Sequence, residues 1–73
     1  MAMEYDAIVE VLGFANGNNR AVRLIMDDGT EVLGVPSSVD LDEEAHEVFL
    51  KPSGDDETEI AISLGAIANV ELV

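Results

Sequence analysis

Apolar and polar side chains alternate along several short segments of the chain, and this alternation limits the folds that it can adopt. In the segment RAVRLIM, the side chains of Val22, Leu24 and Met26 fall on one side of an extended chain. The segment TEIAIS at residues 58–63 repeats the pattern. A period of two predicts half-buried β-strands, whereas an amphipathic helix needs a period near 3.6. We therefore predict strands at residues 5–12, 20–26, 30–35, 47–51, 58–63 and 69–73.

Turn signals separate the predicted strands. Asp28-Gly29 predicts a tight hairpin, because glycine accepts a positive φ without steric cost. Further turns or loops rich in Gly, Asn, Ser and Asp are expected at residues 13–19, 52–57 and 65–67, the last as a single 3₁₀-like turn.

The longest predicted connection covers residues 37–45. Pro36 is expected to end the preceding strand, in which Gly34 marks a bend or a bulge. Ser37 or Ser38 could cap one short helical turn in the connection. The helical potential is confined to this part of the chain, which is too short for a helical bundle.

Five or six short strands joined by tight turns within 73 residues predict an all-β protein. The expected fold is a small SH3-like or Sm-like barrel with at most one short helical turn, because closure removes exposed strand edges. Residues 1–73 are expected to form this single domain.

The composition excludes the usual covalent and metal supports of small domains. The chain has no cysteine, and its one histidine, His46, is not enough for an imidazole metal site. Self-association is the remaining support, and we expect a homo-oligomer. No apolar run approaches the ~18 residues of a membrane span, and no secretory leader is recognisable, so a cytoplasmic protein is expected.

Sixteen acidic residues against three basic ones give a net charge of −13. Residues 27–59 hold twelve of the acids and only Lys51 as a base, so most of the negative charge lies there. Such a field repels phosphate backbones and disfavours direct binding of nucleic acid. Two explanations stay open: adaptation to concentrated salt, and a docking surface for a basic protein.

The turn residues give the docking surface a predicted place. In a meander of strands, the turns at 27–29 and 52–57 both follow even-numbered strands and so lie at the same end of the sheet. We predict that they form one negative pole, which is the candidate partner-binding site: Asp27, Asp28, Asp55, Asp56 and Glu57.

Motifs of catalysis and of cofactor or metal binding are absent from the sequence. The stretch DLDEEA at residues 40–45 resembles a calcium loop only faintly, since Ala45 and Lys51 stand where that loop needs glycine and glutamate. No serine lies in a Gly-x-Ser-x-Gly elbow, and no glycine-rich phosphate loop is present. We therefore expect no enzyme activity, no cofactor and no metal.

Two stretches resemble Sm-like proteins. VRLIMDDGTEVLGV, residues 22–35, is similar to their opening hairpin, and IAISLGAIANVEL, residues 60–72, resembles the end of the Rho-binding antiterminator (Rof) family and of WYL-type modules. This resemblance implies an acidic Sm-like fold that presents carboxylates to the RNA-binding surface of Rho.

The chain also departs from these families. The RNA-binding asparagine of Sm proteins is missing from DLDEEAHE, and Leu64-Gly65 replaces their Arg-Gly pair. The strand reading leaves no room for the helix that precedes the antiterminator barrel.

The function expected from all this is a non-catalytic acidic interaction or regulatory module with a basic protein partner. A Rho-antiterminator-like transcription regulator is the first alternative, and an Sm-like RNA-binding protein, disfavoured by charge, is the second. The apolar side chains on both faces of residues 5–12, together with those of the last strand, predict that the homo-oligomer forms through the first or the last strand.

Overall fold

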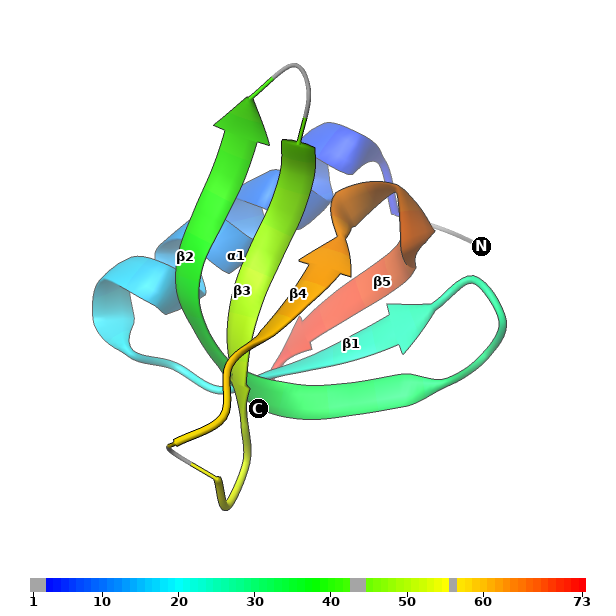
Figure 1. The fold of residues 1–73 in the computed structure, drawn as a ribbon. Helices are drawn as coiled ribbons and strands as arrows, with labels where there is room; N and C mark the ends of the chain where they lie inside the picture. The colour runs from blue at the N-terminus through cyan, green and yellow to red at the C-terminus, as the bar shows by residue number, and fades with distance from the viewer. Residues whose placement is uncertain (1–2, 43–44, 56) are drawn as a thin grey trace.

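The computed structural model describes residues 3–42, 45–55 and 57–73 and shows an α+β fold. One helix precedes five antiparallel strands and a 3₁₀ turn (Figure 1). The elements in chain order are α1 (Tyr5–Asn18), β1 (Val22–Met26), β2 (Glu31–Asp42), β3 (Ala45–Pro52), β4 (Ile60–Ser63), η1 (Leu64–Ala66) and β5 (Ile67–Leu72).

The predicted all-β fold is wrong, because the segment predicted as a first strand and the loop after it form α1. Ile8, Leu12 and Ala15 are all buried, and their spacing of four and three residues puts them on one helix face. Asp6 lies in the first turn, where a carboxylate interacts favourably with the helix dipole. Asn19 ends the helix in the left-handed conformation with a φ of 52°.

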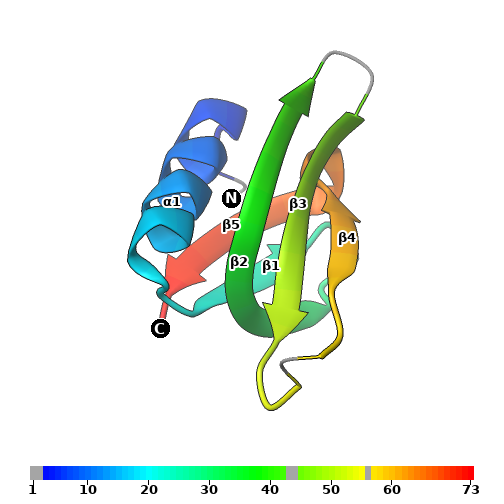
Figure 2. The same cartoon turned by 60° about the vertical axis from the view of Figure 1, so that its left-hand side comes forward.

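The predicted barrel is also wrong, because the sheet is open. Its strand order is β4-β3-β2-β1-β5, with β4 and β5 at the two edges. All four pairings are antiparallel. The helix packs on one face of the sheet, as Figures 1 and 2 both show, and so the core is closed by a helix instead of by the sheet itself.

β2 is one long, bent strand, and Pro36 does not end it. Its first part, up to Gly34, pairs with β1, and the part from Gly34 onward pairs with β3. The register shifts between Pro36 and Ser38, which marks a β-bulge. The predicted connection with a helical turn at residues 37–45 is therefore wrong, since most of it is strand; residues 43 and 44 lie outside the described part of the chain.

Gly34 allows the close approach of the strands at this bend. A Cβ atom placed on Gly34 would run into the carbonyl oxygen of Lys51 and touch the side chain of Leu50. The bend predicted at Gly34 is thus present, and it depends on a residue without a side chain.

The core lies between α1 and the concave side of the sheet. Its largest fully buried side chains are four leucines, Leu12, Leu24, Leu50 and Leu64. Burying a leucine side chain contributes about 1.5–3 kcal/mol. The buried members of this cluster come from α1, β1, β3, η1 and β5, whereas β2 and β4 pack partly buried side chains against it: Val32, Val39, Ile60 and Ile62.

The predicted turns at the hairpins are confirmed. Gly29 and Gly54 have φ values of 89° and 86°, which fit glycine at tight turns. The predicted 3₁₀ turn is η1, and the strand predicted before it is β4. No helix in the described ranges is long and apolar enough to cross a membrane.

Candidate partner-binding surface

The β1–β2 turn holds two of the five predicted site residues, Asp27 and Asp28. The N–H of Gly29 donates to the carbonyl of Met26 at 2.9 Å, and the Thr30 N–H donates to the Asp28 carboxylate at 2.9 Å. Both aspartates are exposed. The hydrogen bonds from Thr30 lower the pKa of Asp28 below its ordinary value of 3.8, so this carboxylate is charged at neutral pH.

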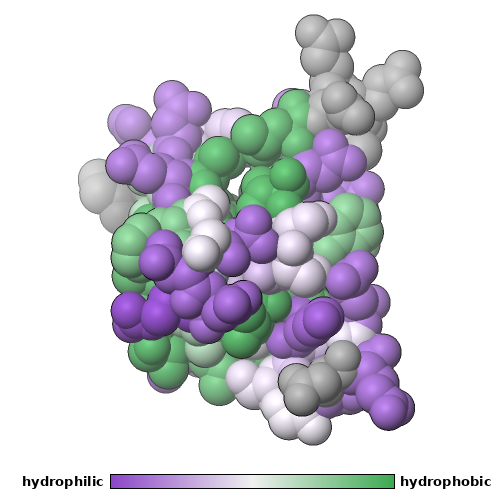
Figure 3. Space-filling model, turned by 90° about the vertical axis from the view of Figure 1, so that its left-hand side faces the viewer, coloured by the Kyte–Doolittle hydropathy of each residue, from purple (hydrophilic) through white to green (hydrophobic). Residues whose placement is uncertain are grey.

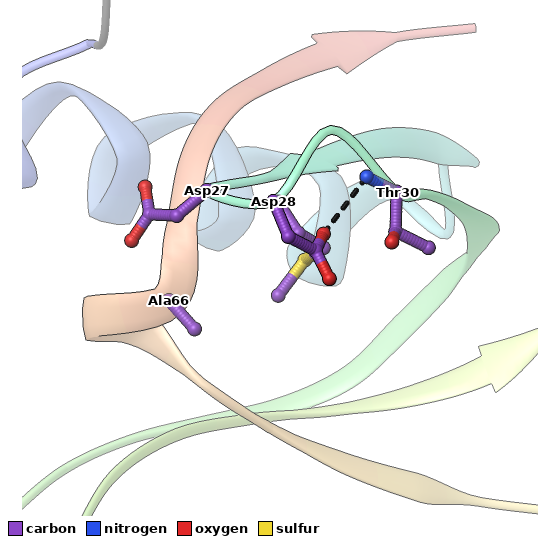
Figure 4. Close-up of a pocket in the computed structure, with 5 residues that line it drawn as sticks. Asp27, Asp28, Thr30 and Ala66 are labelled. Atoms are coloured by element: carbon purple, nitrogen blue, oxygen red, sulfur yellow. Dashed lines mark hydrogen bonds between the residues drawn. The ribbon is translucent and has the colours of Figure 1, made fainter.

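A hydrogen bond from a distant part of the sequence fixes the turn. The N–H of Asp27 donates to the carbonyl of Ala66 in η1 at 2.9 Å. A shallow cavity of about 330 Å³ lies here, lined by Met26, Asp27, Asp28, Thr30 and Ala66. Figure 4 shows the Asp28 carboxylate beside Thr30, whereas the Asp27 carboxylate points away from it. The cavity is thus lined by two acidic residues and by Met26 and Ala66, with the carboxylates of the two aspartates pointing in different directions.

The β3–β4 turn holds Asp55 and Glu57, while Asp56 lies outside the described residues. One oxygen of Asp55 accepts from the N–H groups of Glu57 and Thr58, both at 3.2 Å, and the other accepts from the Thr58 hydroxyl at 2.6 Å. These bonds, with that of the Thr58 hydroxyl first, lower the pKa of Asp55. Its carboxylate is engaged in shaping its own turn.

The structure does not bring the two acidic turns together. The Ser53 N–H donates to the carbonyl of Leu33, the third residue of β2, at 3.0 Å, so the β3–β4 turn begins beside the first part of β2. The β1–β2 turn lies at the start of β2, and the two turns are well apart in Figures 1 and 2. The simple meander geometry fails because β2 bends and pairs with β1 and β3 along different parts of its length.

The one ion-pair network formed by the described residues centres on Arg23. Its guanidinium lies 3.4 Å from Glu31 and 3.3 Å from Glu71, on the two strands that flank β1. All three side chains are about half exposed, and pairs of this kind contribute under ~1 kcal/mol. Arg23 therefore links the three strands β2, β1 and β5 and does not neutralise the turn carboxylates.

The polar residues weighed as catalytic candidates are dispersed. The Ser37 hydroxyl lies 2.7 Å from the Glu59 carboxylate and 3.0 Å from the carbonyl of Phe49. Its hydrogen-bonding partners therefore belong to the sheet and the segment before β4. The exposed His46 ring lies next to the ring of Tyr5, with 5.9 Å between their centroids. No group of three or more His, Asp and Glu side chains suited to a metal ion occurs within residues 3–42, 45–55 and 57–73.

A second surface feature was missed by the sequence analysis. Val11 and Phe14 of α1 and Leu72 of β5 line an apolar groove of about 280 Å³, with Glu10 at its rim. The spacing of three residues between Val11 and Phe14 is a helical signal, which is lost when residues 5–12 are read as a strand.

Comparisons of this chain with protein-family models, with curated proteins and with solved structures find no match.

Proposed function

We propose that this chain is a non-catalytic interaction module that binds a basic protein through its β1–β2 turn. The observation that carries the proposal is the cavity at this turn, which the acidic residues Asp27 and Asp28 line together with Met26 and Ala66. A lysine or arginine has the same two-part character, with an apolar stem and a charged head.

The recognition would place one cationic side chain in the cavity. Its stem would pack on Met26 and Ala66 while its head meets the Asp28 carboxylate, and Asp27 adds a second negative charge on the same turn. Because the hydrogen bond between Asp27 and Ala66 already fixes the turn, little ordering entropy is lost on binding. The net charge of −13 attracts a basic partner from a distance and speeds the encounter.

The β1–β2 turn is a better candidate than the β3–β4 turn. Asp55 accepts three hydrogen bonds from Glu57 and Thr58 within its own turn, whereas Asp28 accepts from the backbone and the side chain of one residue, Thr30, and the N–H of Asp27 donates to Ala66. The β1–β2 turn also adds a second carboxylate, that of Asp27, and the apolar side chains of Met26 and Ala66, and this combination suits a cationic side chain.

A Rho-antiterminator-like regulator is the second candidate, and α1 favours it. The strand reading of the sequence left no room for a helix before the sheet, yet α1 occupies that position. Such a regulator also presents acids to a basic surface, so it is a specific form of the same proposal. The predicted homo-oligomer stays a prediction, with β5 as an edge strand that can carry it.

Affinity capture with charge-matched variants tests the proposal. The immobilised chain, the variant D27N/D28N and the control variant D55N/E57Q are each exposed to an extract of the source cells at 0.15 M KCl. The two variants lose the same two charges. We expect a basic protein to be retained by the native chain and the control and lost from D27N/D28N. Equal loss from both variants would show a general charge effect and contradict a site at the β1–β2 turn.

A further inference from the structure

The apolar groove between α1 and β5 is built on two well-anchored elements. Ile8, Leu12 and Ala15 bury the neighbouring face of the helix in the core, and Val11 is itself partly buried against that core. At the end of β5, the N–H of Val73 donates to the carbonyl of Ala21 at 3.0 Å, which keeps the neighbouring Leu72 in the β-ladder. The groove is therefore a fixed surface feature.

Its apolar side chains are exposed although the core is close by. Phe14 is 50% exposed and Leu72 43% exposed, and Val73 next to Leu72 is 57% exposed. Leu72 lies two residues after the buried Val70, so both side chains point to the helix side of the sheet. Exposed apolar side chains gathered at one place indicate a binding surface more than isolated ones do.

A second copy of the chain is a poor occupant of this groove. A stable interface buries about 800 Å² on each partner, and the groove offers only three apolar side chains, Val11, Phe14 and Leu72. Figure 3 shows, on the face that it presents, apolar patches divided by hydrophilic atoms instead of one continuous area. Two copies would also bring together a charge of −13 each.

The charges around the groove favour a cationic occupant. Glu10 lines the groove, and Asp6 lies one turn earlier on the same helix side. The helix itself has no lysine or arginine. The volume of about 280 Å³ is at the lower limit of small-molecule sites, ~300–1,000 Å³, and suits a single large side chain.

We infer that the groove binds one apolar side chain of a basic protein segment, with a lysine or arginine next to it in sequence that meets Glu10. This inference rests on the proposed function, since it assigns a second contact point to the same basic partner. The β1–β2 turn takes a cationic side chain, and the groove takes an apolar anchor.

Two synthetic peptides test the inference, and both keep the same positive charge. One has the sequence Lys-Gly-Lys-Leu-Lys-Gly-Lys, and the other has serine in place of its leucine. Their affinities are measured by isothermal titration for the native chain and for three variants, Phe14→Ser, Leu72→Ser and Leu33→Ser. Leu33 is the matched control, because it is 42% exposed and pairs with Arg23 on the opposite face of the sheet.

We expect the leucine peptide to bind the native chain about fivefold more tightly than the serine peptide, as burial of about one methylene group in this open groove predicts. The advantage should fall below about twofold in Phe14→Ser and Leu72→Ser and persist in Leu33→Ser. Circular dichroism and melting temperature verify that each variant is folded.

Three results would overturn the inference. Equal binding of the two peptides by the native chain refutes the groove while leaving the charge-based function standing. Binding of neither peptide at 0.05 M KCl refutes both. A native chain that dimerises by light scattering and becomes monomeric in Phe14→Ser shows that a second copy occupies the groove.

Discussion

The backbone N–H of Asp27 donates a 2.9 Å hydrogen bond to the carbonyl of Ala66, which joins the β1–β2 turn to the 3₁₀ turn before β5. The two residues are far apart in the sequence, and their contact sets the position of the acidic turn against the rest of the fold. An acidic hairpin that is fixed in this way presents its carboxylates in a defined geometry, which a free loop does not.

The bend of β2 depends on the contact between Gly34 and the backbone of Lys51. We predict that Gly34→Ala destabilises the protein by about 1–3 kcal/mol, because the added methyl group forces the strands apart. Gly13→Ala is the control: this helical glycine has open space around it, and the change should stabilise by about 0.5–1 kcal/mol. Urea unfolding measures both, and a neutral Gly34→Ala would contradict the packing at the bend.

The buried face of α1, formed by Ile8, Leu12 and Ala15, should contribute strongly to the free energy of unfolding. Leu12→Ala removes a fully buried side chain and is expected to cost about 2–5 kcal/mol. Leu41→Ala, at an exposed position of β2, should change the free energy of unfolding by less than about 0.5 kcal/mol. Similar effects of the two substitutions would show that α1 does not pack as described.

Acid should remove a stabilising contribution from Asp55. The pKa of Asp55 is lower in the folded protein than in the unfolded chain, so its charged carboxylate stabilises the fold at every pH above the pKa of the unfolded chain. This contribution is lost as the pH falls below about 4. Asn in its place does not titrate, and we therefore predict a smaller fall in melting temperature from pH 6 to pH 3 for Asp55→Asn than for the native chain. Parallel curves for the two proteins would contradict the hydrogen bonds of this turn.

Salt should stabilise the domain, because it screens the repulsion between its carboxylates. With a net charge of −13, carboxylate repulsion opposes folding, and the Debye length falls from ~10 Å at 0.1 M salt to ~3 Å at 1 M. We predict a melting temperature that rises between 0.1 and 2 M KCl. A flat or falling melting temperature would refute the interpretation that the acids are an adaptation to concentrated salt.

Most of the strands after residue 20 could be predicted because their signals are local, whereas the second half of β2, residues 37–42, was predicted as a connection. Asp28-Gly29 is a strong hairpin signal, and the alternation of residues 58–63 led to the strand that contains β4. The helix was missed because Ile8, Val9 and Val11 favour strands by propensity, and Gly13 and Gly17 resemble loop residues. The spacing of Ile8, Leu12 and Ala15 contained the helical signal, but tertiary packing was needed to select it.

The candidate site could be predicted only in part. The acidic residues of each turn are visible in the sequence, whereas the separation of the turns depends on the bend of β2 at Gly34 and Pro36. The contact between Asp27 and Ala66 depends on the position of η1, and no local pattern indicates it. The groove at Phe14 and Leu72 required both the helix and its packing on β5.

The most direct measurement of the central claim is a titration of the ¹⁵N-labelled chain with a tri-arginine peptide, followed by amide chemical shifts. The account predicts saturable changes concentrated at Met26 to Thr30 and at Ala66, which disappear in D27N/D28N and persist in D55N/E57Q. Changes spread evenly over both acidic turns, or reduced equally by the two variants, would contradict a specific cationic site at the β1–β2 turn.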